Sequence, residues 1–256
     1  MSGVGLHFRQ RIAAGWRVWL DALIPPYCPA TGAPVSAPGD MSPNGWAGLH
    51  FIDEPLCAVC GVPFGHDYGA DAVCAACIAA PPAFERARAA VVYDDASHGL
   101  VVRFKHSDGT ELAPMFARWM ARAGAPLLEA GAVLAPVPLH RRRLIVRRYN
   151  QAALLSRALS ALTGAPVLMT ALARKRATPP QKNLSADARR RNVAGAFEVR
   201  AEAVPDVAGA RIVLVDDVLT TGATLSAAAR ALLKAGAASV DALALARVVK
   251  GGLDAI

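Results

Sequence analysis

The sequence lacks any long run of apolar residues. No stretch reaches the ~20 uncharged residues that a transmembrane helix needs, and this excludes a helical membrane span. The first 24 residues also lack the unbroken apolar segment of a secretory signal, because Arg9, Arg11 and Arg17 interrupt them. We therefore expect a soluble, cytoplasmic protein.

Aromatic residues and cysteines are also few. Aromatic side chains make up 6% of the 256 residues, and cysteine occurs five times. The hydrophobic fraction of 54% is too high for a disordered chain, and the length suits one large domain or one domain with an appendage. The net charge of +8 favours a polyanionic partner, such as a phosphate, a nucleotide or a nucleic acid, without choosing among them.

Residues 6–24 have the pattern of an amphipathic helix. Apolar side chains recur at steps of three and four residues, and Pro25-Pro26 ends the pattern. The arginines of this helix are compatible with an anionic membrane surface, whereas packing as a lid on the rest of the protein is the commoner arrangement. Both interpretations stay open, and we favour the lid. The apolar positions are Phe8, Ile12, Trp16, Trp19, Leu20 and Leu23.

The composition of the chain changes near residue 83. Residues 25–82 are rich in glycine, proline and cysteine and have too few apolar stretches to build a core alone. Beyond Pro81-Pro82, alanine-rich helical stretches alternate with β-branched runs. This alternation predicts an α/β domain over residues 83–256, with a parallel sheet flanked by helices. The predicted strands are RAAVVYD, AVLAPVP, RIVLVDD and SVDALALARV.

Two further segments of this α/β domain have recognisable patterns. Residues 150–162 predict a helix that Gly164 and Pro166 close. Residues 174–192 are polar and contain Pro179-Pro180, which predicts a long loop followed by a short helix after Ser185. A loop of this length in a compact domain usually has a function.

Four of the five cysteines form two Cys-x-x-Cys pairs. Thirteen residues separate the pairs, which is the spacing of a four-thiolate zinc ribbon. We expect each pair on a tight turn, with a β-hairpin between them that brings the sulfurs together. Two buried or redox-active pairs are the alternative, which a reducing compartment disfavours. Four thiolates leave no open coordination position, so the predicted Zn²⁺ is structural; its ligands are Cys57, Cys60, Cys74 and Cys77.

The segment around Cys28 resembles a second ribbon that has lost its ligands. Thr31 stands where a second cysteine belongs, and Ser42-Pro-Asn-Gly45 takes the place of the partner pair. These three positions supply no thiolates, so we expect no second zinc. We interpret Cys28 as a small buried hydrophobic residue. The region before residue 83 is therefore predicted to contain two ribbons, of which only the second is intact.

The segment from Arg211 to Leu225 carries the most informative chemistry. Its apolar start predicts a strand over residues 212–215 that ends in Asp216 and Asp217, followed by a short turn and an alanine-rich helix. Ligands of open α/β sheets bind at the carboxyl ends of strands, where the amides of a helix start form an anion site. An ordinary turn with capping threonines is the alternative, and the two adjacent acids argue against it. The turn therefore predicts a phosphate site, with acids that bind sugar hydroxyls or a magnesium shell.

The residues VLVDDVLTTGAT resemble the phosphoribosyl-diphosphate (PRPP) signature of type I phosphoribosyltransferases and lack the Gly-x-x-x-x-Gly-Lys pattern of a Walker loop. Together with the preceding ribbon, they resemble the ComF family of competence-protein-F-like proteins. The resemblance runs from Pro25 to Arg247 and implies a phosphoribosyltransferase type I-like sheet with a small amino-terminal zinc-ribbon domain. It rests on PPYC, the CxxC pairs, RFKH, PVPLHRRR, RRYNQ, TPPQKNLSADARRRNVAGAF and the signature.

The resemblance also implies where PRPP binds. The two acids would be catalytic and hold the ribose hydroxyls, and the turn after them would hold the 5′-phosphate. The loop after the strand AVLAPVP would face the pyrophosphate, with His140, Arg141 and Arg143 as candidates. The implied PRPP-binding residues of the signature are Asp216, Asp217, Val218, Leu219, Thr220, Thr221, Gly222, Ala223 and Thr224. Arg147, Tyr149, Asn150 and Gln151 match a family block and are candidate substrate or nucleic-acid contacts.

Clustered basic residues leave three interpretations open. They are compatible with solvated surface, with neutralisation of pyrophosphate, or with contacts to a nucleic-acid backbone. Few aromatic residues lie near them for base stacking, so we expect no sequence-specific recognition of bases. Arg148, in one such run, stands where the family often has glycine, which changes how its loop approaches a substrate. The runs are Arg141–Arg143, Arg147-Arg148, Arg174-Lys175-Arg176 and Arg189–Arg191.

Two hypotheses for the function follow. The first is Mg²⁺-dependent binding of PRPP or a ribose phosphate, with transfer of the phosphoribosyl group to an unidentified acceptor left open. The second is a non-catalytic accessory of single-stranded DNA uptake or processing, with DNA-uptake proteins as partners, because the family is linked to uptake of transforming DNA. In either case we expect no stable membrane insertion. We also expect the ribbon and the sheet to have separate sources of stability, since metal binding supplies much of the folding free energy of a ribbon.

Overall fold

The computed structural model of the protein describes residues 25–140, 144–145, 148–176 and 191–249. The predicted helix over residues 6–24 lies outside the described residues, as do Arg141, Arg143 and Arg147. The chain divides into two compact units, Met1–Gly48 and Leu49–Ile256. Among the described helices, none has the length and apolar character needed to cross a membrane.

The first unit contains one short described helix, α2 (Pro43–Ala47). Ser42 caps it, because its hydroxyl oxygen accepts a hydrogen bond from the amide of Gly45 at 3.1 Å. An isolated antiparallel bridge joins Tyr27 and Pro34. This unit therefore holds the remains of the first ribbon.

The second unit is built on a four-stranded parallel sheet. Its strands lie in the order β1-β6-β5-β2, and all three pairs of neighbours are parallel. The four predicted strands and the predicted parallel sheet are thus confirmed. The strands are β1 (Ala87–Val92), β2 (Ala132–Pro136), β5 (Arg211–Leu219) and β6 (Ser239–Arg247).

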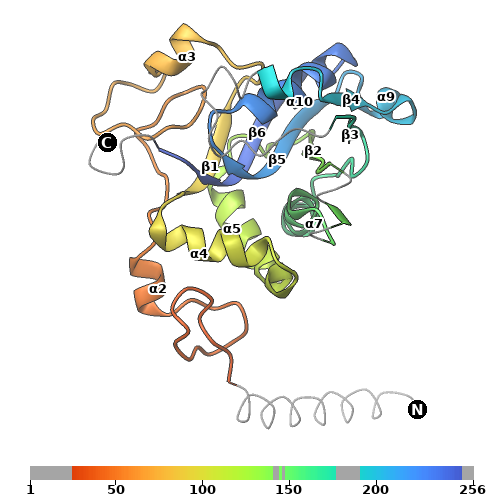
Figure 1. The fold of residues 1–256 in the computed structure, drawn as a ribbon. Helices are drawn as coiled ribbons and strands as arrows, with labels where there is room; N and C mark the ends of the chain where they lie inside the picture. The colour runs from red at the N-terminus through yellow and green to blue at the C-terminus, as the bar shows by residue number, and fades with distance from the viewer. Residues whose placement is uncertain (1–24, 141–143, 146–147, 177–190, 250–256) are drawn as a thin grey trace, which may run out of the picture. The chain divides into compact units, whose positions relative to one another are not determined.

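Both faces of the sheet carry helices (Figure 1). The helix α10 (Ala223–Lys234) covers one face, and α5 (Ala113–Ala123) and α7 (Gln151–Thr163) pack side by side on the other. A two-stranded antiparallel sheet of β3 and β4 lies beside α10. The smaller elements are α3 (Ala75–Ala79), α4 (Asp95–Phe104), η1 (Ser107–Leu112), β3 (Leu172–Arg174), β4 (Phe197–Val199), η2 (Ala201–Ala203) and α9 (Val204–Val207).

Local capping signals fix the ends of α7. The side chain of Asn150 accepts a hydrogen bond from the amide of Ala152 at 3.1 Å, which satisfies one free amide of the first turn. At the other end Gly164 has a φ of 75°, in the left-handed region that ends many helices. The predicted helix over residues 150–162 is therefore confirmed.

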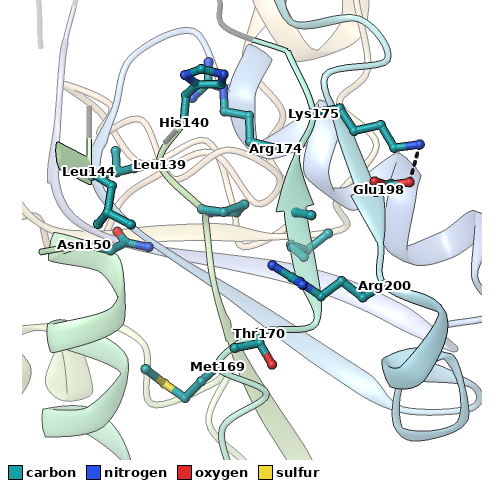
Figure 2. A pocket seen from close by; sticks show the side chains of 13 residues that line it. Leu139, His140, Leu144, Asn150, Met169, Thr170, Arg174, Lys175, Glu198 and Arg200 are labelled. Carbon is teal, nitrogen blue, oxygen red and sulfur yellow. Dashed lines mark ion pairs between the residues drawn. The ribbon is translucent and has the colours of Figure 1, made fainter. Parts of the chain in front are cut away.

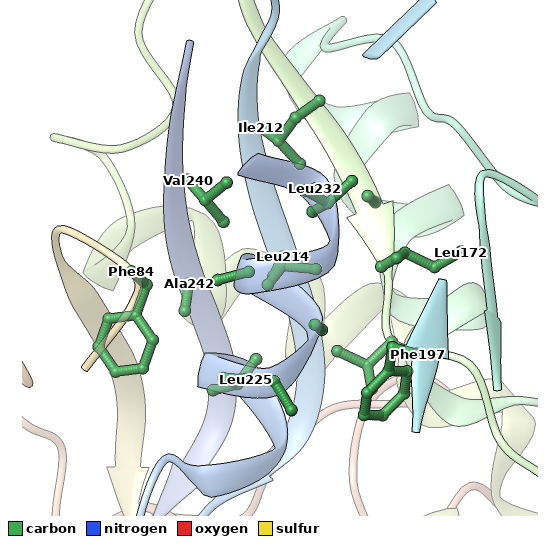
Figure 3. Packing of buried hydrophobic residues seen from close by; sticks show 14 of the residues in the cluster. Phe84, Leu172, Phe197, Ile212, Leu214, Leu225, Leu232, Val240 and Ala242 are labelled. Atoms are coloured by element: carbon green, nitrogen blue, oxygen red, sulfur yellow. The ribbon is translucent and has the colours of Figure 1, made fainter. Parts of the chain in front are cut away.

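The main hydrophobic core lies between the sheet and α10 (Figure 3). Ile212 and Leu214 of β5 point to the same face because side chains alternate along a strand. They meet Leu225 and Leu232 of α10, and all four side chains are at most 1% exposed. Burial of such side chains contributes about 2 kcal/mol each, so this core holds the strand and the helix that flank the signature turn.

The strand order reverses between β2 and β5, and we expect a ligand crevice at this point. The chain leaves β2 through α7 and returns at the outer edge, where Val167 bridges Leu134 in parallel. From β5 it passes through α10 in the opposite direction, to β6. Ligands of open parallel sheets bind at such a reversal, outside the carboxyl ends of the strands.

Candidate phosphate site and zinc centre

The two acids of the signature lie within β5 rather than after it. The predicted strand ended at Val215, whereas the observed strand continues to Leu219. Strand β6 runs alongside this extension and pairs with it, Asp216 opposite Ala244 and Leu219 opposite Arg247. Strand β2 stops at Pro136, opposite Val215. The acids therefore extend past the end of β2, toward the expected crevice.

The two acids lie close to each other and to one lysine. The Asp217 carboxylate lies 3.3 Å from the Lys105 ammonium group, and the Asp217 amide donates a hydrogen bond to Asp216 at 2.9 Å. Burial and the adjacent charge of Asp217 together raise the pKa of Asp216 to about 8. At neutral pH the pair therefore carries one negative charge more readily than two. A ligand that neutralises or hydrogen-bonds the acids restores the second charge.

The predicted phosphate turn follows β5 directly. Thr220, Thr221 and Gly222 connect the strand to α10, which begins at Ala223. Gly222 has a φ of 74°, which disfavours other residues, and a Cβ there would lie 3.4 Å from the ring of Phe84. The first amides of α10 face outward from the helix start, as an anion site requires. The structure thus places the predicted residues 216–224 in one strand–turn–helix at the crevice.

The side chains of Tyr149 and Gln151, which follow Arg148, form hydrogen bonds with neighbouring backbone carbonyls. The Tyr149 hydroxyl donates hydrogen bonds to the carbonyl oxygens of Phe104, at 2.7 Å, and His106. The side chain of Gln151 donates to the carbonyl of Lys105 at 3.4 Å. Both residues therefore support the segment that carries the lysine beside Asp217, which is a positioning role.

Asn150 also contacts neighbouring backbone, at the end of β2. While its oxygen caps α7, its side-chain amide donates to the carbonyl of Val137 at 3.1 Å. Val137 follows β2, and its amide in turn donates to Val215 of β5 at 2.9 Å. Asn150 therefore fixes the start of the loop that leads to His140.

Arg148 occupies a backbone conformation that favours glycine. Its φ is 64°, and it is the one non-glycine residue with positive φ among the described residues. Such a conformation brings the side chain of an L-residue too close to the following carbonyl oxygen. The departure noted in the sequence thus falls at a strained position.

A pocket of about 500 Å³ lies beside the loop after β2 (Figure 2). His140 and Asn150 line it, which are two of the predicted site residues. Figure 2 shows His140 and Arg174 at one end, and Met169 and Thr170 at the other. Its further charged residues are Arg174, Lys175, Arg200 and Glu198, of which Lys175 and Glu198 form an ion pair. Cations outnumber acids in this lining, so an anionic ligand fits it.

Sequence reasoning missed several of these residues. Lys105 lay in a quoted motif, RFKH, but nothing in the sequence indicated its pairing with Asp217. Arg200 and Met169 lie in stretches without a motif, so no local signal marked them. Of the predicted loop over residues 174–192, the segment 177–190 lies outside the described residues, and Arg174 itself ends β3.

The four predicted zinc ligands come together in the structure. The sulfurs of Cys57, Cys60, Cys74 and Cys77 all lie within 4.8 Å of one another. Cys60 and Cys74 Sγ are 3.7 Å apart, close to the ~3.8 Å edge of a tetrahedron with Zn–S bonds of about 2.3 Å. The amides of Cys60 and Cys74 donate to Cys57 Sγ at 3.4 and 3.3 Å. These contacts fit a thiolate cluster, which supports a structural zinc.

The second pair of ligands differs from the prediction. The first pair lies on a hairpin turn, with a bridge from Leu56 to Pro63 and a φ of 66° at Gly61. The second pair lies at a helix start instead, because Cys74 caps α3 and Cys77 is within it. Helix geometry brings residues three apart to one side, so a short helix serves the spacing as well as a turn does.

The positions of the degenerate ribbon also converge. The hydroxyls of Thr31 and Ser42 are 2.9 Å apart, and a Cβ at Gly45 would lie 2.9 Å from Cys28 Sγ. Cys28 is 1% exposed, which confirms that it is buried. Burial raises the pKa of this thiol, but the hydrogen bonds with Ser42 and Thr31 have the larger combined effect. Together they lower the pKa to about 6. The ribbon geometry thus persists with hydroxyls in place of thiolates.

Two family models match the sequence. Residues 19–78 match a double zinc ribbon domain, and residues 152–254 match a phosphoribosyl transferase domain. The zinc cluster and the signature turn fall within these two matches. The predicted domain limits at residues 24/25 and 82/83 stay predictions.

Known proteins resemble this chain over most of its length. The DNA utilization protein YhgH of Salmonella typhi is 36% identical over 202 residues, covering 76% of this chain and 85% of that protein. Competence protein F of Haemophilus influenzae is 32% identical over 214 residues, covering 78% and 93%. A solved structure of glutamine PRPP amidotransferase from B. subtilis matches 56% of this chain and 30% of its own chain, at 20% identity and a TM-score of 0.37. With a double zinc ribbon, a phosphoribosyltransferase domain and this identity to both relatives, the chain belongs to the ComF/YhgH family.

Proposed function

We propose that this protein binds PRPP or a ribose phosphate, together with Mg²⁺, in the crevice between β2 and β5. Asp216 and Asp217 hold the ribose hydroxyls, and the turn from Thr220 to Thr224 holds the 5′-phosphate. The observation that carries the proposal is the order of these groups along one strand–turn–helix. Acids, hydroxyls and helix amides follow one another, as sugar hydroxyls and phosphate do in the ligand.

The pyrophosphate is assigned to the side of the crevice that β2 borders. His140 and the pocket cations Arg174 and Arg200 lie there, and Lys105 adds a positive charge beside Asp217. The carboxylates offer the hard oxygen donors that Mg²⁺ prefers, so Asp216 and Asp217 would hold the ion, which would supply positive charge near the pyrophosphate. If transfer occurs, the chain's own part is to orient the ribose and to stabilise charge as pyrophosphate leaves.

The acceptor and turnover are left open in this proposal. A phosphoribosyltransferase-like domain does not by itself establish catalysis. Four cysteines that serve as zinc ligands suit a reducing compartment, so we place the protein in the cytoplasm.

Thermal stabilisation by ligand tests the proposal. PRPP with Mg²⁺ should raise the melting temperature of the wild type, because a ligand that binds only the folded state stabilises it. The double variant Asp216→Asn with Asp217→Asn should fold and lose this gain. Asp206→Asn, at an exposed acid of α9, should keep it. Full stabilisation of the double variant by PRPP would show that the assigned site is wrong.

A second candidate function is the binding of single-stranded DNA as an uptake or processing accessory, alongside DNA-uptake proteins. The cation-rich pocket lined by Arg174, Lys175 and Arg200 favours it, because phosphodiester contacts need such groups. The name of one relative, the DNA utilization protein YhgH, supports the same function. Comparing thermal stabilisation by PRPP and by single-stranded DNA, each with and without Mg²⁺, separates the two functions.

A further inference from the structure

The intact zinc ribbon is joined to the amino-terminal part of the sheet by close backbone contacts. The amide of Ala87, the first residue of β1, donates to the carbonyl of Val59 at 2.6 Å. The Arg88 guanidinium donates to the carbonyl of Ala58 at 3.1 Å. A Cβ at Gly61 would lie only 2.4 Å from the carbonyl oxygen of Ala87, so only glycine fits there. The ribbon and the sheet accordingly belong to one compact unit.

Arg247, at the end of β6, contacts the zinc cluster through its side chain. Nη1 donates to the carbonyl of Cys60 at 2.7 Å, and Nη2 donates to Cys60 Sγ at 3.2 Å. The residue is 7% exposed, and a buried guanidinium needs an anionic partner because its charge is costly to remove from water. Four thiolates around one Zn²⁺ carry a net charge of −2, so the loaded cluster supplies that partner.

The backbone around Arg247 leads directly to the phosphate turn. Arg247 pairs with Leu219 in the sheet register. The amide of Val248 donates to the carbonyl of Leu219 at 2.9 Å. Leu219 is the last residue of β5, and Thr220 opens the turn. One residue therefore touches a zinc ligand with its side chain and is paired with the residue before the turn through its backbone.

The cluster and the turn also border the same cavity. This cavity has a volume of about 400 Å³, and Cys60, Cys77, Thr220, Thr221 and Arg247 all line it. Arg247 and Leu219 connect the cluster to the turn along this cavity. Loss of zinc frees the four sulfurs and takes from the guanidinium its anionic partner.

We infer that Arg247 couples the zinc site to the phosphate turn, so that zinc loading sets the affinity of the turn for a phosphorylated ligand. The inference rests on the proposed function for the identity of that ligand. Coupling between two sites is reciprocal. A ligand in the turn must therefore raise the equilibrium affinity for zinc by the same factor by which zinc raises the affinity for the ligand.

Equilibrium competition for zinc with a chromogenic chelator measures this coupling directly. In the wild type, saturating ribose 5-phosphate should raise the zinc affinity about fivefold, at the lower end of measured couplings. In Arg247→Met the ratio of the zinc affinities with and without ribose 5-phosphate should fall to about one. Arg88→Met is the matched control, because Arg88 also holds the ribbon backbone but reaches neither a sulfur nor the turn, and it should keep the fivefold ratio. A fivefold ratio that persists in Arg247→Met overturns the inference.

Hydrogen exchange of the wild type separates this inference from the proposed function. After zinc removal, the amides of Val248 and Ser226, which donate to the carbonyls of Leu219 and Gly222 at the two ends of the turn, should lose protection while those of α5 and α7 keep theirs. Unchanged protection of these two amides, or equal loss in α5 and α7, overturns the coupling. If ribose 5-phosphate fails to bind the zinc-loaded protein, the proposed function fails, and exchange at the turn still decides the coupling. The same measurement decides it if Arg247→Met does not fold.

Discussion

Arg148 shows how a single residue can conflict with the backbone it occupies. Its left-handed conformation costs an L-residue roughly 1–2 kcal/mol, whereas glycine avoids this strain and costs about 0.5–1 kcal/mol in lost freedom on folding. We therefore expect Arg148→Gly to stabilise the protein by about 0.5 kcal/mol, a rise of about 1–2 °C in melting temperature for a chain of this size.

Arg148→Ala is the matched control for this substitution. It removes the same guanidinium but keeps a Cβ in the strained conformation, so it should give no gain. A melting temperature for Arg148→Gly at or below that of Arg148→Ala would show that the strain is absent.

Asp216 gives a prediction for the dependence of stability on pH. Burial and the charge of Asp217 raise its pKa from 3.8 to about 8. The unfolded chain releases this proton near pH 4, and the folded protein keeps it up to about pH 8, so the contribution of Asp216 to stability falls as pH rises through that interval. Asn cannot titrate. The melting temperature of Asp216→Asn, relative to wild type, should therefore rise from pH 5 to pH 8.

Melting curves of the ligand-free protein across this range provide the measurement. Asp206→Asn should follow the wild type, because Asp206 is exposed on α9. Parallel curves for wild type and Asp216→Asn would mean that Asp216 ionises normally in the folded protein. A stabilised free protein that loses ligand binding is the pattern expected of a charge kept for function.

At the scale of elements, the sequence predicted what local signals determine. The strands β1, β2, β5 and β6 follow from buried apolar runs, and α7 follows from its periodicity and from capping by Asn150 and Gly164. The zinc ligands follow from spacing alone. In each case the signal lies within the segment itself.

The differences arise where a distant partner decides the structure. Strand β5 continues through both acids because β6 pairs with it as far as Leu219. The sequence of β5 alone does not indicate how far β6 extends beside it. Lys105 and Arg247 likewise take their roles from contacts across the fold, with Asp217 and Cys60. Such residues are found only from the structure, because the spacing of residues in the sequence does not indicate which distant residues form pairs.

At the scale of the molecule, part of the excess positive charge behind the net charge of +8 lies in the pocket beside β2. Three cations and one acid line that pocket, and the run Arg141–Arg143 follows His140 directly in the sequence. This run lies outside the described residues. Both proposed ligands, pyrophosphate and a DNA backbone, need positive charge at this place. One set of variants distinguishes them.

Replacing Arg141, Arg142 and Arg143 together by glutamine gives different results for the two ligands. We expect weaker binding of PRPP and nearly unchanged binding of single-stranded DNA, because the run follows a strand whose carboxyl end borders the same crevice as Asp216. If the run binds DNA instead, affinity should fall alike for all sequences, and the slope of affinity against salt should flatten by up to about three units, since each phosphate contact releases counterions.

Affinity measured over a series of salt concentrations, for both ligands on the same protein, supplies the comparison. The control replaces Arg118, Arg230 and Lys234, which are exposed on α5 and α10, and removes the same charge from other surfaces. If the control weakens DNA binding as much as the variant does, the effect is that of net charge alone. A loss of DNA affinity confined to the Arg141–Arg143 variant, with PRPP binding unchanged, would assign this run to nucleic acid and leave the pyrophosphate to Lys105 and the cations of the pocket.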